Sequence, residues 1–339
     1  MKSFGLGNCV LGVVFAIPVL AGCGGSQTLI AAPGGAQQSV RNSLPFSAAQ
    51  GDVVAGAKDD DSPSWMAPDA HAQDLLYVTN TKTVTVYSYP RGKLEGKLRF
   101  GYLPSSECVD KKGDVFITNL DYNEVVEYAH GGEKPILVLH DPNPVPAGCA
   151  VDLATGDLAV SSLGSGTGGG VAIYKGARGT PRTYTDPVFK EYFLCAYDDK
   201  GNLFVDGQDN YGAFKFAELP EGRKTFTNIT LNQGIGFPGG VQWDGKHVAV
   251  GDQNFPVIYQ FAIKGSSGDE EGKTSLGSGA GDVFQFFVLG SRVIVPNQCK
   301  ASCTGNVLYY EYPAGGTATK TIMKDVRYPH GAVVSKANT

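Results

Sequence analysis

The chain has 339 residues, of which 42% are hydrophobic, and this is enough apolar material for a sizeable core. Its formal net charge of -5 is mild, and no basic stretch marks it as a nucleic-acid-binding protein. Its 46 glycines exceed the usual share and are typical of a fold with many tight turns.

Residues 1–22 have the pattern of an export signal. Lys2 gives a positive start, and residues 6–20 form an apolar run that is too short and too rich in glycine to span a bilayer. The run ends in Leu-Ala-Gly-Cys at residues 20–23, which resembles the lipobox of bacterial lipoproteins. The resemblance implies cleavage before Cys23, lipidation of its thiol and a firm membrane anchor. The alternative is an ordinary cleaved signal that leaves Cys23 free.

The residue after Cys23 bears on the expected location. Gram-negative lipoproteins that are retained at the inner membrane carry Asp at this position, whereas this chain carries Gly24. The resemblance therefore implies an exported protein of the cell envelope, lipid-anchored at the outer membrane or cell surface.

Residues 23–73 are expected to form a flexible, disordered tether. They are rich in small and polar residues and proline and show no sustained periodicity. A flexible chain of about fifty residues spans about 40 Å, which would hold a folded body away from a membrane. Trp65 is the lone tryptophan of this stretch, and we expect it to dock on the folded body.

From residue 74 onward one pattern recurs, in which a glycine turn precedes an apolar strand. Counted from the residue that opens each apolar strand, successive copies begin 40 to 45 residues apart. A period in the forties, built of short strands and glycine turns, is typical of a β-propeller with one four-stranded blade per repeat. The copies lie at residues 110–117, 152–160, 198–205, 243–250 and 288–295, and a truncated copy lies at residues 74–78.

The two ends of the repeat series complement each other. The first repeat lacks an inner strand before Asp74, and the chain finishes with a spare one at residues 329–334. Pairing this strand with the first blade would protect both edges. We therefore predict an all-β fold for residues 74–339, a six-bladed β-propeller of four-stranded blades that is closed by the C-terminal strand.

One copy of the repeat resembles a known family. Residues 146–152 followed by residues 156–160 resemble the NHL repeat, in which a Pro-x-Gly inner strand precedes an Asp, a glycine turn and an apolar strand. Residues 74–339 as a whole resemble uncharacterised lipoprotein propellers of environmental bacteria. The resemblance implies a fold and brings no activity. The chain departs from the pattern after the second strands, where an Asp of the family is replaced by Asn80, Asn119, Ser162 and Gly207.

One face of the predicted propeller gathers polar residues, because inner strands begin where second strands end. Lactonases of the gluconolactonase type, which resemble this fold, bind a divalent cation there through Glu, Asn and Asp side chains, and such oxygen ligands suit calcium. The alternative is that these residues cap turns and bond loop backbone. The candidate ligand face comprises Glu107, Asn119, Tyr192, Asp206, Asp252 and His330, of which Glu107, Asn119, Asp206 and Asp252 are the candidate calcium ligands.

His330 also faintly resembles the lyase histidine of streptogramin-inactivating propellers, although a structural role in its turn is the competing interpretation. The five histidines of the chain show no paired ligand spacing, which argues against zinc. Cys299 and Cys303 lie four residues apart in one loop and are the candidates for a disulfide in an exported chain.

Three further cysteines fall on successive inner strands. A soft-metal site in the channel and small buried thiols between blades are the two interpretations of Cys108, Cys149 and Cys195. Cys108 lies two residues before the next Asp, and the other two lie three before it. A one-residue offset turns a side chain to the opposite face of its strand, which favours buried thiols.

Two classes of function remain open. The first is an exported, membrane-anchored binding or scaffold module that takes a protein, a glycan or a small molecule on one face. The second is a calcium-dependent lactonase or hydrolase. The sequence shows no nucleophile–base pair and no firm set of metal ligands, so we prefer the first and assign no cofactor.

Overall fold

The computed structural model describes residues 62–101, 103–166, 168–277, 279–298 and 304–337. The expected signal peptide, Cys23, Cys299, Cys303 and most of the expected tether lie outside the described residues. Within these ranges the chain is all β, apart from the short 3-10 turns η1 (Ala70–Ala72) and η2 (Lys175–Ala177). No helix among the described residues is long and apolar enough to cross a membrane.

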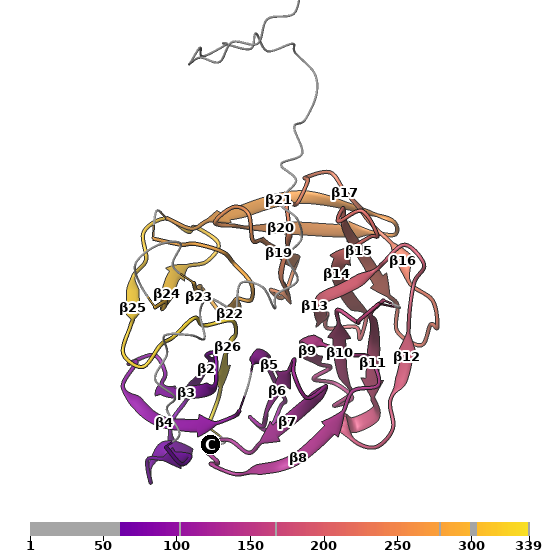
Figure 1. The fold of residues 1–339 in the computed structure, drawn as a ribbon. Helices are drawn as coiled ribbons and strands as arrows, with labels where there is room; N and C mark the ends of the chain where they lie inside the picture. The colour runs from indigo at the N-terminus through magenta and orange to yellow at the C-terminus, as the bar shows by residue number, and fades with distance from the viewer. Residues whose placement is uncertain (1–61, 102, 167, 278, 299–303, 338–339) are drawn as a thin grey trace, which may run out of the picture. The chain divides into compact units, whose positions relative to one another are not determined.

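The strands form six sheets that surround a common axis as blades, which confirms the predicted six-bladed β-propeller (Figure 1). We number the blades in chain order of their second strands. The inner strands of blades 1 to 6 are β26 (Ala332–Ser335), β5 (Pro104–Val109), β9 (Pro146–Val151), β13 (Glu191–Tyr197), β18 (Pro238–Trp243) and β22 (Phe287–Leu289).

The other strands follow outward in each blade. The second strands are β2 (Leu75–Thr79), β6 (Val115–Asn119), β10 (Leu158–Ser162), β14 (Leu203–Gln208), β19 (Val248–Asp252) and β23 (Arg292–Asn297). The third strands are β3 (Thr83–Ser88), β7 (Glu124–Tyr128), β11 (Gly170–Tyr174), β15 (Phe214–Leu219), β20 (Val257–Lys264) and β24 (Asn306–Glu311). The fourth strands are β4 (Leu94–Arg99), β8 (Pro135–His140), β12 (Arg182–Tyr184), β16 (Thr227–Asn228), β21 (Ser267–Ser275) and β25 (Lys320–Ile322).

The ring closes as predicted. The C-terminal strand β26 pairs antiparallel with β2 of blade 1, with Leu75 opposite Ser335 and Val78 opposite Ala332. The hydroxyl of Thr79 accepts the backbone N–H of Gly331 at 2.7 Å, which holds the start of the closing strand in place. Closure thus joins the two ends of the repeat series and leaves neither inner edge open.

Two short strands extend the sheets beyond four strands. β1 (Trp65–Met66) pairs with β4 on the outside of blade 1, and β17 (Thr230–Leu231) pairs with β21 on the outside of blade 5. The segment around Trp65 therefore contacts the folded body through strand pairing and through Met66, whereas the Trp65 side chain itself is 41% exposed. Strand pairing begins before the expected boundary at residue 74.

The apolar core lies between the blades. Tyr77 of blade 1 and Ile117 of blade 2 belong to one cluster of buried side chains, and Phe116 of blade 2 and Val160 of blade 3 belong to the next. Neighbouring residues of β6 thus face opposite blades, because side chains alternate along a strand. Both faces of each blade are therefore needed for packing.

Small residues allow the inner strands to approach one another near the axis. A Cβ atom added to Gly148 would lie 2.6 Å from the carbonyl oxygen of Phe193 in the next blade. A Cβ atom added to Gly239 would lie 2.7 Å from the carbonyl oxygen of Val283, which precedes the inner strand of blade 6. Only glycine fits these two positions without displacing backbone.

The turns between inner and second strands share one geometry. Gly113, Gly156 and Gly201 have φ of 84°, 77° and 83°, a region that residues with a Cβ atom resist. The carboxylate of the Asp that opens each turn accepts backbone N–H groups two residues on, as Asp198 does from Lys200 at 2.9 Å. These turns lie at one end of the propeller, which we call the turn face.

Candidate functional site

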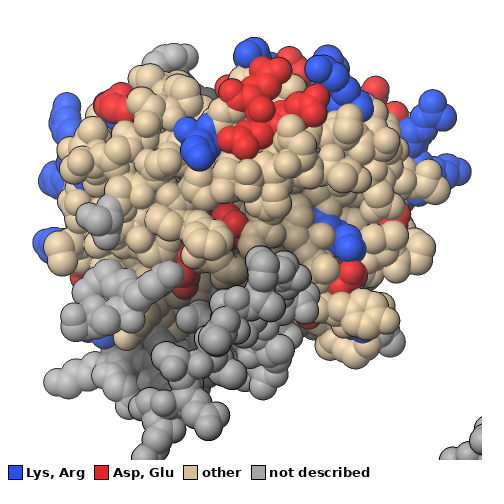
Figure 2. Space-filling model, turned by 90° about the horizontal axis from the view of Figure 1, so that it is seen from above, with Lys and Arg blue, Asp and Glu red and all other residues tan. Residues whose placement is uncertain are grey.

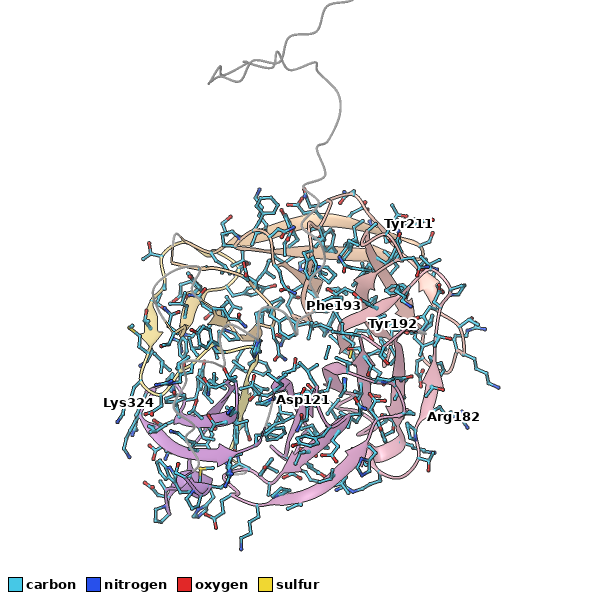
Figure 3. The ribbon with its side chains drawn as sticks, viewed as in Figure 1. Asp121, Arg182, Tyr192, Phe193, Tyr211 and Lys324 are labelled. Carbon is cyan, nitrogen blue, oxygen red and sulfur yellow. A yellow bond between two sulfur atoms is a disulfide. The ribbon has the colours of Figure 1, made fainter. Side chains whose placement is uncertain are left out.

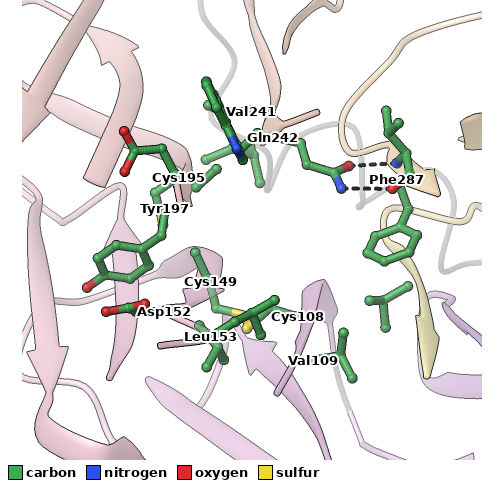
Figure 4. A pocket seen from close by; sticks show the side chains of 18 of the residues that line it. Cys108, Val109, Cys149, Asp152, Leu153, Cys195, Tyr197, Val241, Gln242 and Phe287 are labelled. Atoms are coloured by element: carbon green, nitrogen blue, oxygen red, sulfur yellow. Dashed lines mark hydrogen bonds between the residues drawn. A yellow bond between two sulfur atoms is a disulfide. The ribbon is translucent and has the colours of Figure 1, made fainter. Parts of the chain in front are cut away.

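A cavity of about 590 Å³ lies on the axis of the propeller and is lined by the inner strands of all six blades. Its lining also includes Leu153 and Asp199 from the turns that follow β9 and β13, so it opens on the turn face (Figure 4). The predicted ligand face lies at the other end of the inner strands. This cavity therefore opens at the end of the propeller opposite to the face that the sequence favoured.

The wall of the cavity is mainly apolar. The aromatic side chains of Tyr197, Trp243 and Phe287 line it together with aliphatic residues of the inner strands. Leu153 stands at the opening and is 58% exposed. Such a wall favours contact with an apolar ligand over a strongly hydrated one.

Aromatic pairs lie at the opposite ends of the inner strands. The ring of Phe193 meets that of Phe237 edge-on at 5.4 Å, and the ring of Phe284 meets that of His330 at 6.0 Å. Phe193 lies beside the axis in Figure 3. None of these four residues belongs to the lining of the cavity, whereas Glu107 and Gln285 do.

Two glutamine side chains form hydrogen bonds that join different blades in the wall of the cavity. The side-chain amide of Gln242 in blade 5 donates to the carbonyl of Val288 at 3.0 Å and accepts its N–H at 2.7 Å (Figure 4). The amide of Gln285 likewise donates to the carbonyl of Glu107 at 2.7 Å and accepts its N–H at 3.2 Å. Both amides are thus occupied by backbone, and they stiffen the cavity rather than face a ligand.

The acidic side chains of the lining are not balanced by basic ones. The lining includes four acidic residues, and no lysine, arginine or histidine belongs to it within the described part of the chain. Asp152 accepts the backbone N–H of Ala154 at 2.8 Å and the hydroxyl of Thr155 at 2.6 Å. The acidic lining residues are Glu107, Asp152, Asp198 and Asp199.

Glu107 is the least expected of these acids. It is 1% exposed and lies opposite Ile117, a member of the apolar cluster between blades 1 and 2. Within the described ranges neither of its carboxyl oxygens has a hydrogen-bond partner. Burial raises the pKa of Glu107 well above its usual value, so the side chain is held as a neutral acid.

The other residues of the predicted ligand face do not converge on one site. Asp252 accepts the N–H groups of Gly236, Phe237 and Asn254 at 2.6, 3.2 and 2.9 Å. Asn119 accepts the N–H of Asp121 at 3.2 Å. These contacts are those of turn-capping side chains, the alternative that the sequence left open.

Three further members of the predicted ligand face also have separate local surroundings. Asp206 is fully buried, accepts the N–H of Leu194 at 2.8 Å, and has a pKa raised well above its usual value by burial. The hydroxyl of Tyr192 accepts the N–H of Asp186 at 2.6 Å. Burial lowers the pKa of His330 to about 4, which keeps the imidazole neutral at neutral pH.

The candidate calcium ligands consequently do not fit a metal ion. Glu107 lies against an apolar cluster, Asp206 is bound to the backbone of its own blade, and the carboxylate of Asp252 is taken by three amides. Among the described residues no group of three or more His, Cys, Asp or Glu side chains is placed to hold a metal.

The inner-strand cysteines differ from both expectations. Cys108 and Cys149 form a disulfide between blades 2 and 3, with their Cα atoms 5.7 Å apart, so they are neither a metal site nor two free thiols. Cys195 is the one described cysteine that remains free. It is buried in the cluster between blades 3 and 4, and burial raises the pKa of its thiol to about 12.

One signal for the cavity is present in the sequence, and it lies in the last residues of the inner strands rather than in the polar residues. In blades 2 to 5 the inner strand ends directly before the turn Asp, and the last residue of each of these strands lines the cavity. Tyr197 and Trp243 hold it before Asp198 and Asp244, and Val109 and Val151 hold it in blades 2 and 3.

No family model and no curated protein matches the chain. Similar chains are found among solved structures. One is from the crystal structure of a nidogen/laminin complex, with a TM-score of 0.62 and 14% identity, covering 78% of this chain and 100% of that one. Another is a protein of unknown function from Bacteroides caccae, with a TM-score of 0.59 and 10% identity, covering 78% of this chain and 99% of that one.

At these identities the likeness shows the fold alone. The fold defines the class of the protein as a six-bladed β-propeller. The resemblance to NHL repeats and to lipoprotein propellers stays a prediction.

Proposed function

We propose that this protein is a binding module that holds a small, largely apolar molecule in the axial cavity of the propeller. The observation that carries the proposal is the cavity of about 590 Å³, lined by all six inner strands and open on the turn face. Its volume is that of an ordinary small-molecule site, and such sites are mostly apolar with a few polar groups.

The rigidity of the wall also supports binding. The disulfide joins blades 2 and 3, Gln242 joins blades 5 and 6, and Gln285 joins blade 6 to blade 2. A cavity that is already formed loses little conformational freedom when a ligand enters, which favours affinity.

The lactonase alternative has less support. The four candidate calcium ligands have separate local partners or lie in the core, and Cys195 is a buried thiol with a raised pKa. A nucleophile needs a lowered pKa or an adjacent base, and Cys195 has the opposite environment. We therefore prefer binding over catalysis.

The proposal includes export and lipid anchoring at Cys23, with the propeller held at the cell envelope by the tether. The disulfide between Cys108 and Cys149 supports export, because disulfides form and persist mainly outside the reducing cytosol. No nucleic-acid partner is proposed.

Titration with the neutral dye N-phenyl-1-naphthylamine, whose emission rises in apolar surroundings, tests the proposal. We expect one dye per chain, and we expect the double variant Leu153→Ala with Trp243→Ala to bind about tenfold or more weakly. Tyr211→Ala is the matched control, because Tyr211 is 94% exposed and lies outside the lining. Equal binding by both variants would refute the site.

A further inference from the structure

We propose that the ligand of the axial cavity is an apolar molecule that carries a positively charged nitrogen, and that this charge rests at the opening beside Asp198 and Asp199. This inference rests on the proposed function. It adds the sign of the ligand's charge and the residues that recognise it.

The charge of the lining carries the inference. Asp152, Asp198 and Asp199 follow the inner strands of blades 3 and 4 and lie around one side of the opening. Aspartates carry negative charge at neutral pH, and the lining offers no basic side chain among the described residues to offset it. An anionic ligand would meet like charges there, whereas an ammonium group would meet opposite ones.

The aromatic residues at the opening suit the same ligand. Tyr197 and Trp243 end the inner strands of adjacent blades, and each directly precedes a turn aspartate. Figure 4 shows the Tyr197 ring beside Asp152, and this ring also packs against the buried cluster between blades 3 and 4. Ammonium groups bind aromatic faces, and the attraction increases when water is excluded.

Four basic residues of the neighbouring turns have other surroundings, and Lys200, which follows Asp199, does not belong to the lining. Lys111, Lys112 and Arg178 line a separate cavity of about 350 Å³ between blades 2 and 3, where Arg178 binds Glu127 at 2.7 Å. Lys246 of the blade 5 turn lies 3.4 Å from Glu271 on β21. The acidic character of the axial opening is therefore not cancelled by these side chains.

Three probes that share one apolar chain separate the contributions: octyltrimethylammonium, octanol and octanoate. Each is titrated calorimetrically into the full-length chain below its micelle-forming concentration. We expect the cation to bind about tenfold more tightly than the alcohol, and octanoate to bind more weakly than either.

A double variant, Asp198→Asn with Asp199→Asn, tests the location. Asn keeps an oxygen that can accept the turn N–H groups of Lys200 and Asn202, but it loses the acceptor for the side-chain amide of Asn202, which lies 2.9 Å from Asp198. We therefore expect the fold to be retained, with a melting temperature lowered by only a few degrees. We expect the preference for the cation to fall to about twofold or less, with octanol binding unaltered. The control is Asp269→Asn on β21, an outer strand of blade 5 that does not line the cavity. Acidic side chains gather on the side of the ring that Figure 2 shows.

The outcomes distinguish the two proposals. Equal binding of all three probes overturns the inference about charge and leaves the apolar site standing. A preference for the cation that survives in the double variant overturns the assignment to Asp198 and Asp199. Failure of all three probes to bind overturns the proposed function itself.

Discussion

Cys108 and Cys149 form a disulfide although they occupy different positions relative to the turn of their repeats. Cys108 lies opposite Phe116 and faces forward to blade 3, whereas Cys149 lies opposite Val160 and faces back to blade 2. The one-residue offset that argued against a shared site is therefore what brings the two sulfur atoms together. Cys195 faces back to blade 3 in the next cluster, which leaves it without a cysteine to pair with.

Loss of this disulfide should destabilise the propeller. The bridge closes a separation of 41 residues, so replacing both cysteines with serine should lower the free energy of unfolding by about 2–5 kcal/mol. Urea unfolding of the exported protein measures this. The matched control is alkylation of the denatured, unreduced protein followed by peptide mapping. Cys195 should be labelled, and labelling of Cys108 or Cys149 would contradict the bridge.

Ring closure through β26 should depend on its buried side chains. Val333 is 1% exposed and packs between blades 1 and 2, so Val333→Asp should cost about 3–5 kcal/mol by burying an unpaired charge. Met323→Asp is the control, because Met323 is exposed and should tolerate the change within about 0.5 kcal/mol. Thermal melts that were equal for the two variants would show that the closing strand is dispensable.

The glycine turns should be more sensitive than an ordinary surface glycine. Gly201 has a φ of 83°, and Gly201→Val should cost more than about 1 kcal/mol through backbone strain. Gly234→Val is the comparison, because a Cβ atom there meets nothing within 4 Å and no positive φ applies. Chemical unfolding of both variants checks the difference, and a larger loss at Gly234 would count against the role of the turn.

Glu107 should make stability depend on pH. Burial raises the pKa of Glu107 in the folded protein above its unfolded value of 4.5. The contribution of Glu107 to the free energy of unfolding is therefore full below pH 4.5 and is lost as the pH rises toward the pKa of the folded state. Glu107→Gln should remove this loss, so the variant should gain stability relative to the parent as the pH rises above about 4.5. Glu133→Gln at an exposed position should show no such trend in urea unfolding at several pH values.

The anchor is tested by fractionation. Cys23→Ala should release the exported protein from membranes, because lipidation of that thiol supplies the anchor under the proposal. Cys9→Ala within the expected signal should leave the membrane fraction unchanged. Retention of the Cys23→Ala protein in membranes would end the lipoprotein proposal.

The sequence by itself determined the propeller, the number of blades and the closing strand. These features depend on local signals: apolar strands such as residues 115–119, positive-φ glycines such as Gly113, and a period repeated along the chain. Each signal acts through a few neighbouring residues, so it can be recognised before the chain is folded. The turn-capping role of Asp252, one of two alternatives left open, is equally local.

Only the tertiary structure decided the disulfide, the buried state of Glu107 and the position of the cavity. The side of the strand on which an inner-strand side chain lies depends on irregularities such as the register shift between Pro104 and Glu107. The residue that this side chain contacts in the next blade depends on how the two blades pack. The cavity exists because six inner strands meet around an axis, so its wall comes from residues up to 226 positions apart in the chain, as Glu107 and Val333 are. No local pattern contains that geometry, since it arises only when the ring is complete.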